Sequence, residues 1–395
     1  MKEKVIVEEL NRMYNDVADE LNISDSVYES AKRSYEELGE YLSNHIKYEV
    51  DVYPQGSMSI GTTIKPVSDK DDYDLDAVCQ IDSSFEEAST LKNIVGDVLK
   101  KSKRYSILLD KEGKRCWTLN YKSKNFHLDV LPATPYEIHT TRVRITNKDL
   151  KTNTYEFRLS DPKGYAEWFL NKQRKVHDNL LAEYREQYKD SVESLKEYKV
   201  RTPLQKTVQL LKRHRDIKYK DASDKRKKEK PISIIITTLV AKMYTGEENI
   251  YQLLRKFVCD YKKYIDVDSE GNFVISNPVN PQENFADKWK EYPERKDAFF
   301  KWVESAKKEL IDNNFLKTEG RIEQANYLKT IFGDSTITNV YFNNTNRYKD
   351  GKTKCINHDS LATLSNHPTD MEVKKHTFYG IKISKKKKEL GRAIQ

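Results

Sequence analysis

The stretch Tyr73-Asp74-Leu75-Asp76-Ala77 decides the fold of this chain, because it sets two acids at alternate positions between hydrophobic neighbours. Side chains alternate across a β-strand, so Asp74 and Asp76 share one face of the expected strand. Two adjacent carboxylates repel each other unless a cation lies between them. Oxygen ligands at this spacing suit Mg²⁺, which accepts substrate phosphates as further ligands. Asp72 lies on the same face, but we favour Asp74 and Asp76 because hydrophobic residues bracket both.

A third carboxylate, Asp129, lies in another apolar stretch, Phe126-His127-Leu128-Asp129-Val130-Leu131. If this second strand pairs beside the first, three carboxylates converge and can hold two metal ions. Such a pair of ions activates an attacking hydroxyl and neutralises a leaving pyrophosphate. The alternative for Asp129 is an ion pair with a lysine. We expect His127 to lie off the face of Asp129, in the core or behind the acids.

The segment Gln55-Gly56-Ser57 follows a strand-like alternation over residues 48–53. Glycine lets backbone amides approach phosphate oxygens closely, and Ser57 adds a hydroxyl donor. A Gly-Ser pair alone is weak evidence for a phosphate site. Two metal-type acids on the next strand and a third on a later strand make the combination specific.

Both helices and strands are predicted around the three acids and the Gly-Ser pair. Residues 1–46 predict two helices, with a cap at Ser24 or Asp25 before the second. Strands and helices then mix, including a hairpin with arms 115–121 and 126–131, which is typical of an α/β or α+β domain.

The second half of the chain has a different pattern. After Ser160-Asp161-Pro162 it is almost wholly helical to about residue 333. The basic loop 221–230, expected to be solvated, and the Asn/Pro loop 276–284 interrupt it. We expect a catalytic core with N-terminal helices over residues 1–160, a helical domain that completes the cleft over 161–334, and an irregular extension with a basic tail over 335–395.

Composition bounds the classes of function. Lys and Arg number 70 against 62 Asp and Glu, a net charge of +8, which suggests polyanionic ligands without demanding a nucleic-acid scaffold. The chain has no run of eighteen apolar residues and its start lacks the apolar core of a signal peptide, so we expect no membrane span. Its four cysteines are scattered, which favours a cytoplasmic location.

The Gly-Ser pair and the three acids resemble the DNA-polymerase-beta-like nucleotidyltransferase superfamily. Within it, the chain resembles the bacterial cGAS/DncV-like nucleotidyltransferases (CD-NTases), the second-messenger oligonucleotide or dinucleotide synthetases. The resemblance spans roughly residues 10–330 and includes the runs 55–64, 127–133, 203–214 and 277–286. It implies an α+β fold in which a mixed sheet and a helical domain face each other across a central active-site cleft. An N-terminal helix would run along both as a spine.

The resemblance also implies residue roles. Asp74, Asp76 and Asp129 would hold two Mg²⁺ ions, with Mn²⁺ as a substitute. Gln55, Gly56 and Ser57 would bind the donor triphosphate, Lys212 would be the triphosphate-binding lysine, and Ser233 the phosphate-binding serine. Two alternatives stay open: Lys212 and its neighbours Arg213 and Arg215 could be merely exposed, and Ser233 could simply cap its helix. Ile234 stands where some relatives carry a base-stacking aromatic, so base identity is unassigned.

The activity implied is Mg²⁺-dependent synthesis of a cyclic di- or oligonucleotide from nucleoside triphosphates, ATP among them, with release of pyrophosphate, in CBASS-type antiphage signalling. Alternatives are a template-free linear oligonucleotide synthase or a nucleotidyltransferase that modifies RNA, protein or a drug. A non-enzymatic nucleic-acid sensor is a third, against which the intact acid triad argues. We expect a monomer that needs no nucleic acid for synthesis. The resemblance also allows a regulatory or conjugating partner protein.

Overall fold

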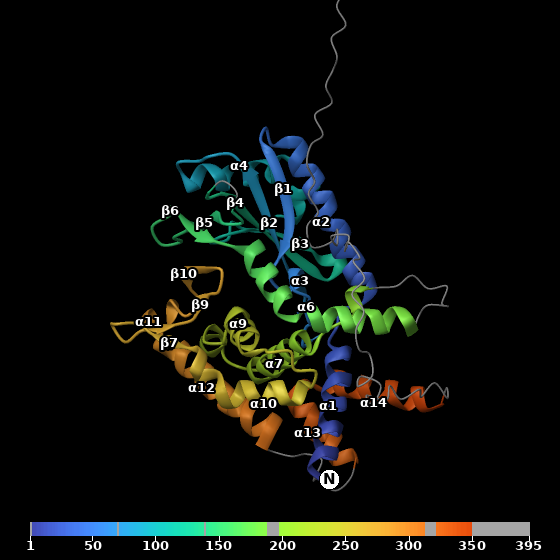
Figure 1. Ribbon diagram of the computed structural model, residues 1–395. Coiled ribbons are helices and arrows are strands. Elements are labelled where there is room, and N and C mark those ends of the chain that lie inside the picture. The colour runs from blue at the N-terminus through green and yellow to red at the C-terminus, as the bar shows by residue number, and fades with distance from the viewer. Residues whose placement is uncertain (1, 69–70, 138–139, 188–196, 313–320, 350–395) are drawn as a thin grey trace, which may run out of the picture.

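The computed structural model describes residues 2–68, 71–137, 140–187, 197–312 and 321–349. A mixed sheet with its covering helices forms one lobe, and a bundle of helices forms the second (Figure 1). The expected α+β fold with two lobes is confirmed. Within the described residues, no helix is long and apolar enough to cross a membrane.

The sheet of the first lobe has six strands. Its order is β1-β2-β4-β5-β6, with β3 paired to β4 off this path, and the β2–β4 pair is parallel while the other pairs are antiparallel. The expected hairpin is present, and it turns through Asn125 in the left-handed conformation (φ 56°). The strands are β1 (Glu49–Gln55), β2 (Tyr73–Asp82), β3 (Trp117–Tyr121), β4 (Phe126–Pro135), β5 (Val143–Lys148) and β6 (Tyr155–Ser160).

The two faces of this sheet differ because of the alternation along β2. Leu75 and Ala77 point to one face, where helices α2 (Asp25–His45) and α4 (Ala88–Lys101) cover a large apolar core. Asp74 and Asp76 point to the opposite face. The first lobe also contains two single-turn helices, α3 (Gly56–Ser59) and α5 (Tyr105–Leu108).

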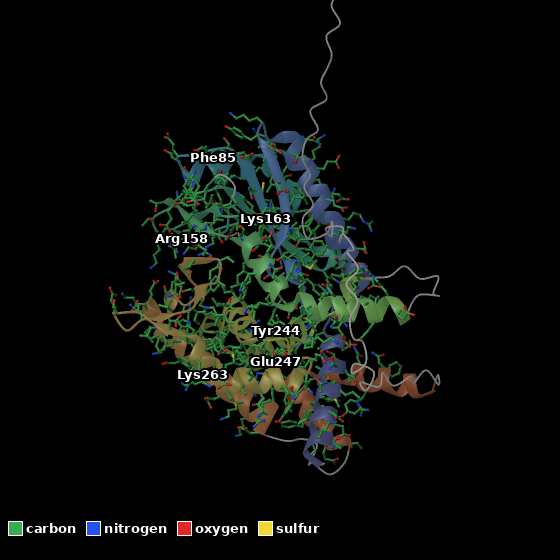
Figure 2. All side chains as sticks on the ribbon, in the orientation of Figure 1. Phe85, Arg158, Lys163, Tyr244, Glu247 and Lys263 are labelled. Atoms are coloured by element: carbon green, nitrogen blue, oxygen red, sulfur yellow. The ribbon has the colours of Figure 1, made fainter. Side chains whose placement is uncertain are left out.

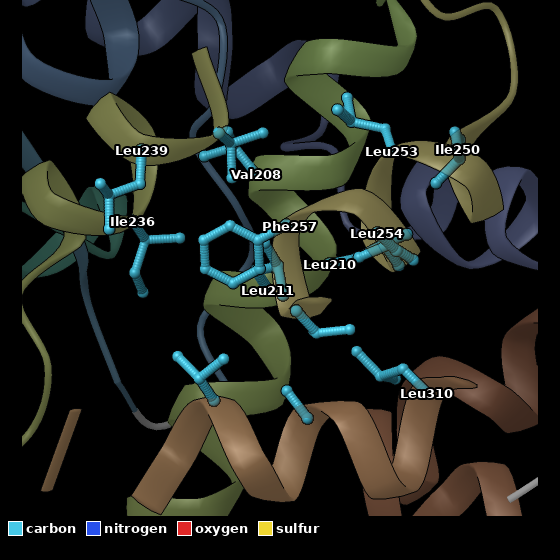
Figure 3. Packing of buried hydrophobic residues seen from close by; sticks show 14 of the residues in the cluster. Val208, Leu210, Leu211, Ile236, Leu239, Ile250, Leu253, Leu254, Phe257 and Leu310 are labelled. Atoms are coloured by element: carbon cyan, nitrogen blue, oxygen red, sulfur yellow. The ribbon is translucent and has the colours of Figure 1, made fainter. Parts of the chain in front are cut away.

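The second lobe packs around helix α7 (Pro203–Tyr219), which starts at a capping box between Thr202 and Gln205. Figure 3 shows Phe257 lying among side chains of α7 and α9, in the middle of the apolar core of this lobe. The other helices are α6 (Pro162–Gln187), α8 (Asp224–Lys228), α9 (Ser233–Met243), α10 (Ile250–Asp260), α11 (Lys288–Glu291), α12 (Pro293–Lys307), α13 (Arg321–Phe332) and α14 (Asp334–Lys349).

The expected spine consists of two consecutive helices. Helix α1 (Lys2–Glu20) buries Leu10, Tyr14 and Val17 in the core of the helical lobe. Helix α2 follows it along the sheet lobe (Figure 1), and Ser24 caps α2 by accepting from Val27 N. The first helix of the expected catalytic core therefore packs with the helical lobe.

Two expectations for the second half were wrong. Residues 335–349 are not irregular, because they lie in α14, which packs on α13 and α1 and buries Ile337 and Val340. Their Asn- and Thr-rich sequence has little helical periodicity, so tertiary burial stabilises this helix. Strands also interrupt the helical pattern where no break was expected, since β7 (Asp266–Val267) pairs with β8 (Phe273–Val274). The expected break at 276–284 is present and contains the paired strands β9 (Ser276–Asn277) and β10 (Asn280–Asn284). The expected tail, within 350–395, lies outside the described residues.

Candidate active site

The structure brings the three acids of the sequence analysis together. Because β2 and β4 are parallel neighbours, Asp76 stands directly opposite Asp129 in the register. One carboxylate oxygen from each of Asp74, Asp76 and Asp129 lies within 4.8 Å of the other two. Asp72, which competed for the assignment, precedes β2 and is not in this cluster.

The electrostatics of the cluster fit a bound cation. Burial, together with the neighbouring Asp74 and Asp129 carboxylates, raises the pKa of Asp76 to about 7. The pKa of Asp74 is lowered, chiefly by a hydrogen bond from His127. Three converging carboxylates that repel one another form an all-oxygen donor set of the kind that Mg²⁺ or Mn²⁺ accepts.

His127 is hydrogen-bonded to this cluster, which confirms the expected position behind the acids, although its face of the strand was predicted wrongly. Its Nε2 lies 3.2 Å from Asp74 Oδ1, and that hydrogen bond raises the pKa of the imidazole. The expectation that it lies off the face of Asp129 was wrong, because residues two apart in a strand share a face. Strand parity was the signal that would have placed it.

Gly56 allows the backbone to approach the acids closely. Strand β1 ends at Gln55, opposite Asp76, and Gly56 then turns the chain with φ +61°. A Cβ at Gly56 would lie 2.5 Å from Asp76 Oδ2, so no other residue fits without a shift. Ser57 Oγ accepts from Thr63 Oγ1 at 3.0 Å, which leaves its own hydrogen to donate.

Helix α7 holds the segment 60–66 that follows the Gly-Ser pair. Gln205 Nε2 donates to Ile60 O and Gln209 Nε2 to Thr63 O, both at 2.9 Å. These glutamines lie four residues apart, on one face of the helix. The helical lobe therefore fixes the backbone beside the acids.

Lys212 continues the same face of α7 into the site. It is 7% exposed, and its Nζ donates to Thr62 O at 2.9 Å. Burial, with the nearby Arg215 charge, lowers the pKa of Lys212 to about 8. Arg213 is also buried but donates to the carbonyls of Lys65 (2.8 Å) and Pro66 (3.2 Å). The alternative that these basic side chains are merely exposed is contradicted.

Ser233 is tied to α7 through Arg215. Ser233 is the first residue of α9, but the N-cap is Ile232, so the serine does not cap this helix with its side chain. Arg215 Nη1 donates to Ser233 Oγ at 2.8 Å and to Pro231 O at 3.0 Å. Lys230, from the loop that was expected to be solvated, lies 3.3 Å from Asp216 and lines the same cleft.

A cleft of about 1630 Å³ connects these groups, with walls from both lobes. Pockets for one small ligand typically enclose about 300–1,000 Å³, so this cleft has room for two nucleotides. Gln55, Gly56, Ser57, Asp74, Asp76, Lys212 and Ser233 all line it. Among the lining residues, Arg158 of β6, labelled in Figure 2, approaches Asp287 of the helical lobe at 3.9 Å.

Comparison with known proteins identifies the family. Residues 9–173 match the Second Messenger Oligonucleotide or Dinucleotide Synthetase domain (SMODS). A curated relative, the c-di-GMP synthase of Roseivirga ehrenbergii, is 34% identical over 308 residues, which cover 76% of this chain and 78% of the relative. The chain belongs to the bacterial CD-NTase family. As a CD-NTase it is a nucleotidyltransferase of the cyclic oligonucleotide synthase class, so the non-enzymatic alternative is wrong.

Further CD-NTases share the fold. The cyclic dinucleotide synthase CdnG of Bradyrhizobium diazoefficiens is 25% identical over 279 residues, 67% of this chain and 64% of that protein. The structure of CdnG in complex with GTP has a TM-score of 0.67 at 19% identity, and covers 85% of this chain and 99% of that chain. Vibrio cholerae DncV with the linear intermediate 5′ pppA(3′,5′)pG has a TM-score of 0.51 at 15% identity, and covers 86% and 89%.

Proposed function

We propose that this CD-NTase makes a cyclic dinucleotide from nucleoside triphosphates, with GTP as a substrate. The observation that carries the proposal is the convergence of Asp74, Asp76 and Asp129 within 4.8 Å. These acids lie beside a cleft large enough for two nucleotides. The name of the 34% identical relative, c-di-GMP synthase, supports guanine nucleotides as substrates. ATP was also expected as a substrate from the sequence, and the experiment below tests it alongside GTP.

The three carboxylates are the residues that would hold two divalent cations, Mg²⁺ by their donor chemistry, with Mn²⁺ as a substitute. When bound, the cations supply activation of a sugar hydroxyl and neutralisation of the leaving pyrophosphate. His127 orients the Asp74 carboxylate through its hydrogen bond. Thr118 Oγ1 does the same for Asp129 Oδ1.

The donor triphosphate would lie between the Gly-Ser turn and helix α7. Gly56 lets the backbone of this turn lie against the Asp76 carboxylate, and Ser57 offers its hydroxyl hydrogen. Lys212 has three N–H donors and gives one to Thr62 O, so two remain for phosphate oxygens. Ser233 sits at the same cleft, held by Arg215. In this arrangement residues 1–160 act as the catalytic core and residues 161–334 complete the cleft.

The reaction proceeds by two displacements at phosphorus. A hydroxyl oxygen of one nucleotide attacks the α-phosphorus of the other, the bond to pyrophosphate breaks, and the hydroxyl proton is released. The linear product then turns in the cleft, and its remaining triphosphate undergoes the same displacement to close the ring. Membership in this family supports a signalling role for the product in CBASS-type antiphage defence.

Incubation of the purified protein with each labelled nucleoside triphosphate, singly and in pairs, tests the proposal. The reactions contain Mg²⁺ or Mn²⁺ and are then treated with phosphatase, with Asp129→Asn as the inactive control. We expect a labelled product that resists phosphatase, because a cyclic dinucleotide has no terminal phosphate. A phosphatase-sensitive ladder would indicate a linear oligonucleotide synthase, and no product with any nucleotide pair would overturn the proposal.

A further inference from the structure

The hairpin of β9 and β10 presents buried polar side chains to the cleft, away from the acids. Asn277 and Asn280 stand opposite each other in the antiparallel pair, so their side chains share a face. They are only 2% and 1% exposed, yet both line the cleft. Glu283, on the same hairpin, is half-buried and lines the cleft too. Figure 1 shows this hairpin on the side of the helical lobe that faces β5 and β6.

Hydrogen bonds within the hairpin fix the acceptor. Asn277 Oδ1 accepts from Val279 N at 3.1 Å, which orients the amide so that Nδ2 donates to Glu283 Oε2 at 2.8 Å. A carboxylate has about four acceptor positions, so Glu283 keeps most of its capacity after this bond. Burial raises the pKa of Glu283, against which the Asn277 hydrogen bond and the Arg115 charge act. New donors at this carboxylate would favour its charged form.

Asn280, on the same hairpin as this acceptor, has an unused donor. Its Nδ2 is buried and has no hydrogen-bond partner among the residues that the structure describes. Buried polar groups in native proteins are almost always paired, so an unpaired donor on a residue that lines a cleft indicates a ligand acceptor. Asn284 cannot supply the acceptor, since its side chain bonds the backbone of Ile275, Ala286 and Phe273.

The subsite also has an aromatic wall. Phe285 and Tyr165 both line the cleft and pack edge to face, with ring centroids 6.0 Å apart. An apolar surface beside one amide donor and one carboxylate acceptor suits a planar heterocycle with a polar edge. It suits a sugar or a phosphate poorly, because these offer no flat apolar face and phosphate would be repelled by Glu283.

The donor and acceptor pattern selects among the bases. Guanine presents two adjacent donors, N1–H and the 2-amino group, next to the O6 acceptor. Adenine presents an acceptor at N1 and a single amino group. We infer that Glu283 and Asn280 read the Watson–Crick edge of guanine in one of the two nucleotides bound in the cleft, with Glu283 accepting from N1–H and the 2-amino group and Asn280 donating to O6. This inference rests on the proposed function.

Inosine triphosphate is the probe that isolates the carboxylate contact, because hypoxanthine keeps N1–H and O6 but lacks the 2-amino group. We expect the wild-type protein to use GTP about tenfold better than ITP, the size of one hydrogen bond to a charged group. Glu283→Ala should abolish this difference and lower the preference for GTP over ATP. Asn280→Ala should lower the preference for GTP over ATP but keep the difference between GTP and ITP. Glu270→Gln, a surface change in the same lobe at a residue paired with Lys290, is the control.

Ratios between nucleotides distinguish a loss of base recognition from general damage to the protein, because general damage would lower the use of all nucleotides by the same factor. A wild-type protein that uses GTP and ITP equally, or variants that keep both ratios, would overturn the inference even if a cyclic product forms. Equilibrium binding of the same three nucleotides gives the ratios independently of turnover. If no product forms, but the binding assay shows a GTP preference that Glu283→Ala removes, the proposed function is rejected and this inference stands.

Discussion

Replacing Lys212 by methionine should weaken nucleotide binding strongly while leaving stability nearly unchanged. The ammonium group is buried, and its pKa falls from 10.5 to about 8, chiefly through burial and then the Arg215 charge. A group whose pKa is lowered in the folded state opposes folding while it is charged, here at neutral pH. The shift corresponds to about 3 kcal/mol, since one pKa unit is about 1.4 kcal/mol.

Two contributions to stability then nearly cancel in this variant. Methionine keeps the apolar stem and removes the charge, which relieves the cost of about 3 kcal/mol. It also removes the hydrogen bond to Thr62 O, worth about 1.5–3 kcal/mol for a charged donor. We therefore expect the free energy of unfolding to change by about 1.5 kcal/mol or less. Nucleotide binding loses at least one charged contact to phosphate, which is about 10–100-fold in Kd.

Arg213→Met is the matched control, since adjacent helical residues point about 100° apart. Its two hydrogen bonds go to the carbonyls of Lys65 and Pro66. The control should lose more stability than Lys212→Met and less nucleotide affinity. Isothermal titration with a non-hydrolysable triphosphate and urea denaturation measure the two quantities. Equal losses of affinity, or a larger loss for Arg213, would refute the assignment of Lys212.

Three other expectations follow from the charges of the protein. Asp74→Ala combined with Asp76→Ala should abolish product while the circular dichroism spectrum stays the same, because the change removes mutual repulsion; synthesis near the parent rate would contradict the metal site. Glu309 is held by His214 and Lys218, which outweigh its burial and lower its pKa to about 2. Its contribution to stability is complete above pH 4.5 and falls as the pH approaches 2. Glu309→Gln should therefore reduce the fall in the free energy of unfolding, measured by urea denaturation, between pH 4.5 and pH 2; an unchanged pH dependence would contradict this role of Glu309. The net charge of +8 is spread over many short clusters, so duplex DNA or RNA should not stimulate synthesis at physiological salt; a salt-sensitive stimulation in the product assay would contradict this.

The sequence predicted the parts of the site that lie within single strands, and missed those that depend on packing between lobes. Alternation alone placed Asp74 and Asp76 on one face, and the paired strands then brought Asp129 beside them. Nothing in the sequence showed that Arg215 would hold Ser233, because that contact joins two helices. Helix α14 was missed for the same reason, since its periodicity is weak and its stability comes from burial against α1 and α13.

The contacts of helix α7 lead us to expect that substrate binding depends on the position of the two lobes. Gln205, Gln209 and Lys212 all donate to backbone carbonyls of the segment that follows the Gly-Ser turn. In the chain, that segment follows the expected phosphate-binding residues and precedes strand β2 with its acids. A movement of α7 relative to the sheet would therefore break these hydrogen bonds and shift Lys212 away from the proposed triphosphate site. We therefore expect nucleotide binding to require that both lobes keep this contact, through the carbonyls of residues 60–66 as well as the side chains that line the cleft.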